Sequence, residues 1–292
     1  MKLKTKMLIG GGLLALLPIL VGSFFTGNAA ISVGRDALED DAKQSLIAIR
    51  DITATQITEY IHTIENQALS MSDNPLIIEA MQAFSDQASD YQSADSSNTA
   101  AQKQSLVGYY QNEFGQKFNT LNSKNTIDAP KLLDGLSASS LAMQYDYISN
   151  NPHALGEKQK LDAAKDTGTY ASLHEKFHPY LRSFIERFGY YDLFLVDINS
   201  GKIVYSVFKE LDFATSLISG PYAQSGIGEA FALSQKANTK DFTGLTDFSA
   251  YLPSYNAQAS FISTPIYDSG KKVGILILQM PVDKINGIMT YD

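Results

Sequence analysis

An apolar run near the N-terminus constrains the fold of this chain more than any other feature. It extends over 19 residues, from Met7 to Phe25, without a charged side chain and is interrupted only by small residues and Pro18. At about 1.5 Å of rise per residue, a helix of that length approaches the roughly 30 Å of a bilayer core. Residues 1–6 contain three lysines and no acidic residue. By the positive-inside rule they form a cytoplasmic tip, and the rest of the chain is translocated.

A cleaved signal peptide is the alternative, because Gly27 and Ala29 suit a small-residue cleavage pattern. The apolar part of a signal peptide usually spans about 7–15 residues, so the length of the run favours an uncleaved transmembrane helix over residues 7–25. Both interpretations place the remainder outside the cytoplasm. The uncleaved helix would anchor a periplasmic or extracellular domain in the inner (cell) membrane.

The stretch from Ser32 to Ser72 predicts one long helix. It contains no proline and no glycine after Gly34, and apolar residues recur mostly every three or four positions from Ile49 to Ala68. Unbroken, the helix would be roughly 60 Å long, and a second helix would begin at Pro75 with Asn74 as its cap. A long helix cannot bury its apolar stripe alone. It requires either other helices of this chain or a second copy, and we expect a homodimer.

Composition excludes two classes of site. The net charge is -8 and the chain has only four arginines, so no basic stripe exists for a nucleic acid to follow. The absence of cysteine rules out a disulfide framework and a thiolate metal site.

The C-terminal third predicts an antiparallel sheet. Two apolar runs, Asp192–Asp197 and Lys202–Val207, flank a short polar connection that ends in Gly201, which is typical of a β-hairpin. Both faces of this hairpin are apolar, so we expect it to be central and covered. A helix and loop over residues 212–236 separate it from three more strand-like runs, at Phe242–Tyr251, Ser260–Tyr267 and Val273–Met280. The sequence therefore predicts an α+β chain with a five-stranded antiparallel sheet.

One motif favours a zinc hydrolase. Residues 174–178, His-Glu-Lys-Phe-His, match H-E-x-x-H, and on a straight helix both imidazoles would share a face with Glu175 as general base. Pro179 opposes this interpretation because it removes a helical hydrogen bond and should bend the turn that carries the pair. No histidine after His178 can serve as a third ligand. We therefore interpret the match as accidental, on a helix over residues 170–188 that packs against the sheet, and expect no metal.

Four stretches of the sequence indicate a family: RFGYYDLFLVD, KIVYSVFKELDFATSL, DFSAYLPSYNAQASFISTPI and VGILILQMPVDKINGIM. Through them the chain resembles the extracytoplasmic Cache-type sensor region of bacterial methyl-accepting chemotaxis receptors. The resemblance implies a helical stalk and bundle over residues 32–188, a PAS-like lobe over residues 189–282, and the start of a connecting helix over residues 283–292. It implies a receptor without cofactor rather than an enzyme.

The family continues with a second membrane span, a linker and a signalling coiled coil, so this chain looks like the N-terminal part of a receptor. Similar sensor regions precede histidine kinases and nucleotide cyclases, which leaves the type of output open.

In a PAS-like lobe the ligand lies between the sheet and the helical insertion. The resemblance places seven residues of this chain there: Tyr205, Phe208, Asp212, Tyr222, Asp247, Tyr251 and Tyr255. Tyrosines and carboxylates suit a cationic or amine-bearing small molecule, through ion pairing and cation–π contact. No arginine follows Arg187, so a clamp for the carboxylate of an amino acid would have to come from the preceding helix. Each of these residues could instead serve the core, a helix cap or a turn.

Overall fold

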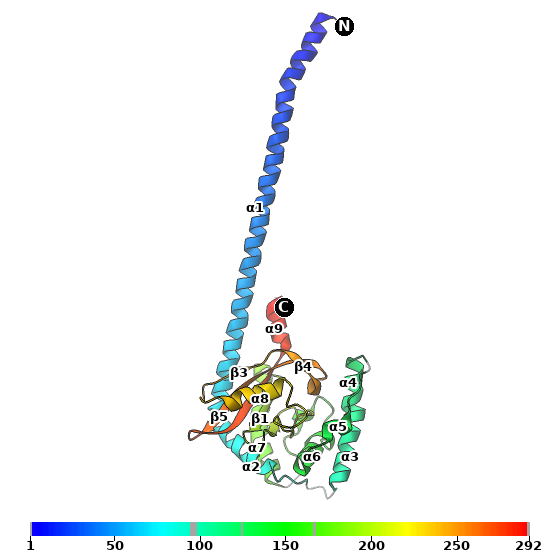
Figure 1. Ribbon diagram of the computed structural model, residues 1–292, viewed down its shortest axis with the longest axis vertical. Helices are drawn as coiled ribbons and strands as arrows, with labels where there is room; N and C mark the ends of the chain where they lie inside the picture. Colours follow the sequence, from blue (N-terminus) through cyan, green and yellow to red (C-terminus); the bar gives the residue numbers. More distant parts are fainter. Residues whose placement is uncertain (1, 94–97, 124, 166–167, 291–292) are drawn as a thin grey trace. The chain divides into compact units, whose positions relative to one another are not determined.

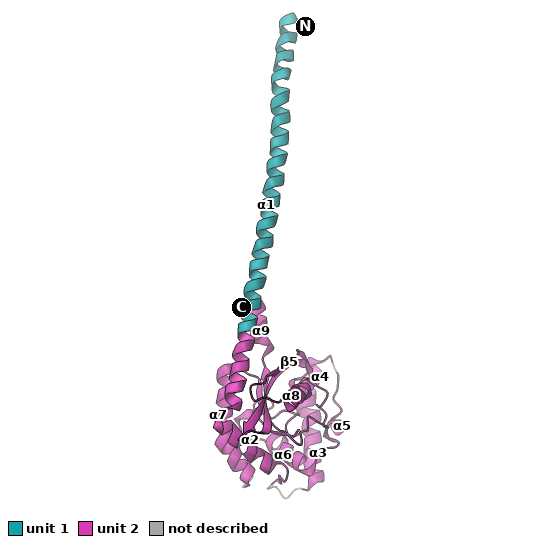
Figure 2. Ribbon diagram, turned by 60° about the vertical axis from the view of Figure 1, so that its left-hand side comes forward, with its two compact units in different colours: residues 1–59 teal, residues 60–292 magenta. Residues whose placement is uncertain are grey.

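The computed structural model describes residues 2–93, 98–123, 125–165 and 168–290. The chain divides into two compact units, Met1–Glu59 and Tyr60–Asp292 (Figure 1; Figure 2). Helix α1, Leu3–Ser72, contributes residues to both units.

Unit 1 is the N-terminal part of α1. Its large apolar side chains, from Leu3 to Ile52, are exposed, and α1 is long and apolar enough to cross a membrane. The prediction of one unbroken helix up to Ser72 is confirmed. Helix α2, Pro75–Ala88, follows at once, and the Asn74 side chain accepts a hydrogen bond from the backbone N–H of Leu76 at 2.9 Å, as expected for its cap.

Unit 2 is built on a six-stranded antiparallel sheet. The strand order is β2-β1-β6-β5-β3, and β4 pairs with β5 outside this path. The strands are β1 Asp192–Asp197, β2 Ile203–Ser206, β3 Gly244–Leu245, β4 Ser249–Tyr251, β5 Ala257–Asp268 and β6 Lys271–Met280. The predicted hairpin of β1 and β2 is confirmed and its strands are buried, but the prediction that it is central is wrong, because β2 is the outermost strand of the sheet. Strands β5 and β6 form the second predicted hairpin.

The prediction of a single strand from Phe242 to Tyr251 is wrong, which is why the sheet has six strands rather than five. Both β3 and β4 pair with β5, but residues 246–248 separate them. In this gap the Asp247 carboxylate accepts a hydrogen bond from the backbone N–H of Phe248 at 2.7 Å. Local bonds of this kind compete with a strand ladder and break it.

Helices cover both faces of the sheet. Leu195 of β1 pairs with Tyr205 of β2, and the Tyr205 ring stacks on Phe84 of α2 with ring centroids 5.0 Å apart. This face also carries α7, Thr169–Phe188. On β5, Ser263 donates a hydrogen bond to the backbone of α8, Gly226–Lys236, at 2.7 Å. The register through β6 aligns Ser263 with Phe194, the neighbour of Leu195, so α8 covers the opposite face.

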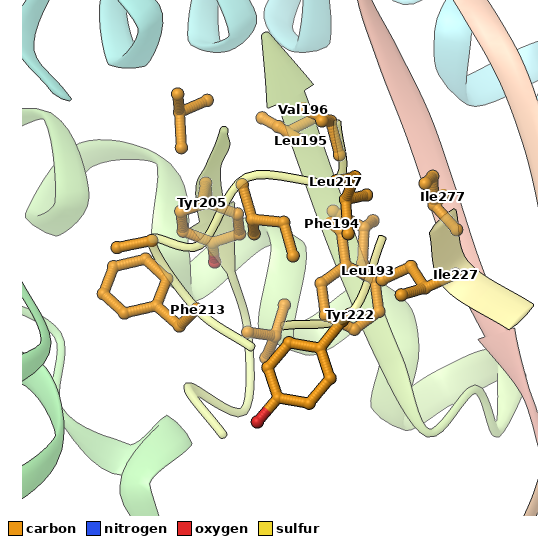
Figure 3. Close-up of a cluster of buried hydrophobic side chains, with 14 of the residues drawn as sticks. Leu193, Phe194, Leu195, Val196, Tyr205, Phe213, Leu217, Tyr222, Ile227 and Ile277 are labelled. Atoms are coloured by element: carbon orange, nitrogen blue, oxygen red, sulfur yellow. The ribbon is translucent and has the colours of Figure 1, made fainter. Parts of the chain in front are cut away.

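A helical region precedes α7 in the chain. It comprises α3 Thr99–Tyr109, α4 Gly115–Leu121, α5 Ala129–Leu133 and α6 Ala138–Gln144, with π-helical turns at Tyr110–Phe114 and Tyr145–Ser149. This region docks on the β2–α8 segment, which we define as residues 207–225. Gln144 donates a hydrogen bond to the carbonyl of Phe213 at 2.6 Å, and Figure 3 shows Phe213, Leu217 and Tyr222 of the segment in the apolar core beside β1. Helix α9, Val282–Thr290, follows β6.

Candidate functional site

The β2–α8 segment carries two acidic residues, Glu210 and Asp212, toward the interior. A hydrogen bond of 3.1 Å from the N–H of Ala214 to the carbonyl of Ile203 ties the segment to β2. Lys209 and Ala214 have φ angles of 56° and 63°, in the left-handed region that residues other than glycine seldom adopt. Backbone strain of this kind persists only where the surrounding structure enforces it, and it concentrates at functional sites.

Asp212 is 1% exposed and is the centre of the site. Its Oδ2 atom accepts a short hydrogen bond from the Tyr251 hydroxyl, whereas Oδ1 has no partner among the described residues. Burial raises the pKa of Asp212 to about 7, although the Tyr251 bond and the backbone N–H groups of Asp212 and Phe213 act in the opposite direction. The carboxyl group therefore changes its charge near neutral pH.

Glu210 lies two positions earlier on the same segment. Its carboxylate accepts hydrogen bonds from the Tyr191 hydroxyl at 2.8 Å and from the Ser254 hydroxyl at 3.5 Å. Burial, and then the charge of Asp212, hold the pKa of Glu210 well above its usual range. Within the described part of the chain neither carboxylate forms a salt bridge. The two acidic groups thus lie close together without a salt bridge, although the charge of Lys117 acts to lower the pKa of Glu210.

Two more polar side chains complete what we call the Asp212 cluster, which consists of Tyr191, Glu210, Asp212, Tyr222, Tyr251, Ser254 and Gln279. The Tyr222 ring lies 6.1 Å from that of Tyr251, and its buried hydroxyl has no partner among the described residues. Gln279 of β6 donates a hydrogen bond to Ser254 at 3.0 Å, while its amide oxygen is buried and likewise unpartnered. Buried acceptors without donors cost free energy, so the cluster favours a ligand that supplies N–H groups.

A cavity of about 10 Å³ adjoins Glu210, with Phe208 and Tyr255 in its wall. It has room for about one water molecule. The Tyr255 ring stacks on Phe114 with centroids 4.6 Å apart, and Nζ of Lys117 lies 4.3 Å from the centroid of the same ring. A ligand larger than a water molecule must therefore displace these aromatic side chains or the β2–α8 segment to reach Glu210.

Of the seven residues that sequence analysis placed in one pocket, Asp212, Tyr222 and Tyr251 meet in the Asp212 cluster. Phe208 and Tyr255 line the small cavity at Glu210. Tyr205 instead lies on the opposite face of the sheet, where its hydroxyl bonds to His178 at 2.6 Å. Asp247 is exposed and occupies the gap between β3 and β4. Strand alternation separates Tyr205 from the others, and the broken ladder turns Asp247 outward.

Sequence analysis missed Glu210 and Gln279. Charged residues are mostly solvated, so nothing local distinguishes Glu210 from an exposed glutamate. Gln279 is the one polar side chain between Ile275 and Met280, a run that is otherwise apolar. An isolated polar residue in a buried strand requires a hydrogen-bond partner, and this was the available signal.

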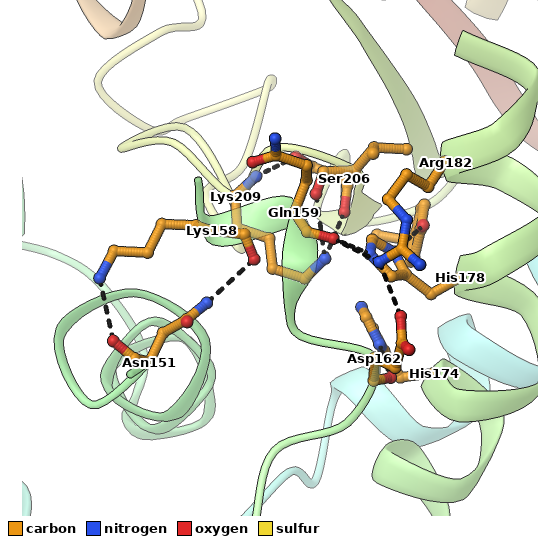
Figure 4. A network of polar contacts seen from close by, with 11 residues as sticks. Asn151, Lys158, Gln159, Asp162, His174, His178, Arg182, Ser206 and Lys209 are labelled. Carbon is orange, nitrogen blue, oxygen red and sulfur yellow. Dashed lines mark hydrogen bonds and ion pairs between the residues drawn. The ribbon is translucent and has the colours of Figure 1, made fainter. Parts of the chain in front are cut away.

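The two histidines of the H-E-x-x-H match lie on α7, with stacked rings whose centroids are 4.3 Å apart (Figure 4). The carbonyl of Gln159 can only accept, so His178 donates to it from Nε2 at 2.6 Å, while Nδ1 accepts from Tyr205. Burial lowers the pKa of His178 to about 2 and that of His174 well below its usual range. Among the described residues no group of three or more His, Cys, Asp or Glu side chains could hold a metal ion.

These neutral histidines tie a loop to α7. His174 bonds through Nδ1 to the carbonyl of Asp162 at 2.5 Å, and Arg182 donates to Gln159 and to the Asp162 carboxylate at 2.9 and 2.7 Å. The helix continues through Pro179 without interruption.

No family model matches the sequence, and no curated protein matches it. Among solved structures, the sensor domain of the V. cholerae histidine kinase DctB aligns with 64% of this chain and 60% of that chain, at 15% sequence identity and a TM-score of 0.30. The matched protein is a sensor domain of a kinase, but a TM-score this low does not establish a common fold.

Proposed function

We propose that this chain is the extracytoplasmic ligand-sensing region of a transmembrane chemoreceptor. Residues 7–25 of α1 serve as its membrane anchor, and the Asp212 cluster binds a small amine-bearing cation. One observation carries the ligand assignment: Asp212 is a buried carboxylate with a partner-free oxygen, beside a second acidic group, and within the described part of the chain neither group forms a salt bridge.

The physical reason is desolvation. Burying an ionised carboxylate costs free energy, which the group avoids by staying protonated or which a cation or several donors offset. An ammonium group supplies both the charge and three N–H donors, which matches the free oxygens of Asp212 and Gln279. The binding free energy of such a ligand includes the relief of this cost.

Aromatic rings strengthen the assignment. Tyr222 and Tyr251 lie at the Asp212 end of the cluster, and Phe208 and Tyr255 line the small cavity at Glu210. Faces of aromatic rings attract cations, with the greatest effect where water is excluded.

Transmission toward the membrane requires that the ligand prefer one of two arrangements. A ligand shifts such an equilibrium by no more than its difference in affinity for the two states. The last turns of α1 belong to unit 2, where Ile64, Ala68 and Met71 are buried. A displaced β2–α8 segment would act on these turns through Tyr190, which precedes β1 and donates a hydrogen bond to Gln67 of α1 at 2.6 Å.

The assignments of oligomeric state and of signalling pathway follow from the resemblance to chemotaxis receptors. A second copy would cover the exposed apolar residues of α1 as a homodimer, and the output would be chemotaxis signalling, with a histidine kinase or nucleotide cyclase as the alternative. The coding sequence downstream of Asp292 tests the output directly. Heptad repeats with methylation sites would support a chemoreceptor. A kinase or cyclase domain would instead support the alternative output.

Calorimetry on the full chain in nanodiscs tests the ligand class. Ethanolamine is the probe, and ethylene glycol, which lacks the amine, is its matched control. We expect ethanolamine to bind and ethylene glycol not to bind. Affinity should increase as the pH rises through about 7, because Asp212 must be ionised in the complex.

Variants locate the site. Asp212→Asn should weaken ethanolamine binding at least about tenfold, since it removes a charge-assisted hydrogen bond. Asp247→Asn is the matched control, because Asp247 is exposed, and should change affinity less than about twofold. Absence of binding by ethanolamine and by the diamine putrescine, or equal binding by the Asp212→Asn variant, would contradict the proposal.

A further inference from the structure

A cavity of about 770 Å³ lies at the end of the sheet where β1 turns into β2. Ser200 and Lys202 of this turn, Ser216 and Pro221 of the β2–α8 segment, and Phe118 of α4 form parts of its wall. Its volume is within the range of small-molecule sites, roughly 300–1,000 Å³. The Asp212 cluster does not contribute a residue to this wall.

Lys202 is the half-buried charge of the wall. Its Nζ atom donates to the carbonyl of Ala88 at 3.0 Å and to the Ser139 hydroxyl at 2.9 Å. Both partners are neutral, and in the described part of the chain no carboxylate forms a salt bridge with Lys202. Burial lowers the pKa of Lys202 to about 8. An ammonium group has three donors, so one donor and the positive charge remain for a ligand.

The other charged residues of the wall, together with Lys103, cancel one another, so Lys202 leaves a positive excess. Asp134 is paired with Lys103 at 3.0 Å, and Asp128 accepts a hydrogen bond from the backbone N–H of Lys131 at 3.2 Å as the cap of α5. With Asp134 neutralised, two lysines, Lys131 and Lys202, face one aspartate. The cavity therefore favours an anion over a cation.

The uncharged part of the wall is rich in hydroxyl groups. Ser137, Ser140, Ser200, Ser216 and Ser219 all contribute to it. Hydroxyls both donate and accept, so they suit a ligand that carries hydroxyl groups itself. Phe118 and Leu252 supply apolar surface for the carbon skeleton.

We propose that this cavity is a second binding site, which takes a small hydroxylated carboxylate with its carboxylate at Lys202 and its hydroxyl groups at the serines. The site is separate from the Asp212 cluster, and neither assignment depends on the other. Its ligand has the opposite charge to the amine.

Gluconate is the probe, and glucitol, the same carbon skeleton without the carboxylate, is the matched control. Both are titrated calorimetrically into the full chain in nanodiscs of uncharged lipid at constant ionic strength. We expect gluconate to bind and glucitol to bind at least about tenfold more weakly, because a charge-assisted hydrogen bond is lost. Equal binding of the two, or no binding of gluconate and of the shorter probe glycerate, would overturn the proposal.

Four variants localise the binding. Lys202→Met should weaken gluconate binding at least about tenfold, and Lys131→Met, at an exposed lysine of the same wall, less than about threefold. Lys202→Met also loses the bond to Ala88, so a second variant fills the cavity instead. Ser219 is exposed and Ser219→Phe should fold and block gluconate. Gluconate binding that survives both Lys202→Met and Ser219→Phe would refute the site, whereas Asp212→Asn should leave gluconate binding intact even if the amine proposal fails.

Discussion

Tyr190 and Tyr191 are adjacent in the chain, yet their hydroxyl groups bond to different parts of unit 2. Tyr190 donates to Gln67 of α1 at 2.6 Å, and Tyr191 donates to Glu210 of the Asp212 cluster at 2.8 Å. One peptide link thus joins the proposed amine site to the last turns of α1. A ligand that displaces Tyr191 from Glu210 therefore also acts on its neighbour Tyr190, whose hydroxyl bonds to α1.

This relationship predicts that binding and transmission can be separated. Tyr190→Phe should leave ethanolamine affinity within about twofold of the wild-type value, because the hydroxyl that it removes bonds to Gln67 and not to the cluster. It should reduce the ligand-induced change in hydrogen exchange over residues 60–72, measured by mass spectrometry. Tyr191→Phe is the counterpart and should weaken binding itself. An unchanged exchange response in the Tyr190→Phe variant would show that coupling takes another route.

The raised pKa of Asp212 predicts a pH dependence of stability. The pKa is about 7 in the folded chain and about 3.9 when unfolded. A raised pKa of an acid stabilises the folded state most below the unfolded value, and this contribution is lost as the pH rises through about 7. We therefore expect Asp212→Asn to flatten the fall in Tm between pH 5 and 8. At pH 8 it should raise the free energy of unfolding, by on the order of 1–3 kcal/mol. Asp247→Asn, at an exposed carboxylate, is the control for the loss of one acidic side chain.

The apolar surface of α1 predicts contact between two copies. The chain has no cysteine, so a single introduced cysteine reports one position without background. Ile49→Cys should form a disulfide-linked dimer in membranes on mild oxidation. Asp51→Cys, about 200° away around the helix, should cross-link several-fold more slowly. If both variants remain monomeric on oxidation, two parallel copies of α1 do not meet near residues 49–51.

The left-handed backbone at Gly189 predicts that a methyl side chain at this position lowers the free energy of unfolding. Gly189 caps α7 with φ at 76°, and an added Cβ would meet no atom within 4 Å, so the cost is purely that of the left-handed backbone. Gly189→Ala should destabilise unit 2 by about 1 kcal/mol in thermal unfolding. Gly108→Ala is the matched control inside α3, where a Cβ also meets open space. It should stabilise by about 0.5–1 kcal/mol, since alanine is the better helix former.

Because the two histidines of α7 form hydrogen bonds within the chain, we expect the stability of the fold not to depend on a metal ion. Dialysis of the full chain against EDTA should not change its Tm, and mass spectrometry should find zinc below one equivalent. His178→Ala should lower the free energy of unfolding by about 1–3 kcal/mol because it leaves the buried Tyr205 hydroxyl without its partner and the Gln159 carbonyl with Arg182 alone. His62→Ala, at an exposed histidine, should change it by less than about 0.5 kcal/mol. One equivalent of zinc that EDTA removes with loss of stability would reverse this interpretation.

Local signals were sufficient for the elements of the fold. The uninterrupted helix to Ser72, the Asn74 cap and the β1–β2 hairpin each follow from residues within a few positions of one another. The division of Phe242–Tyr251 into two strands was not predictable in this way. It depends on whether the Asp247 carboxylate satisfies a neighbouring N–H or turns to solvent, and the ladder with β5 decides that.

The sequence by itself determined the apolar N-terminal helix, the antiparallel sheet and the presence of tyrosines and carboxylates after β2, because periodicity, caps and turns act over a few residues. Only the tertiary structure decided which of these side chains meet. It put Tyr205 on one face of the sheet and Asp212 in a buried cluster with Tyr251, and it brought Glu210 and Gln279 into the same cluster. Burial and the absence of a cation partner arise from residues far apart in the chain, and these two properties give a carboxylate the capacity to bind.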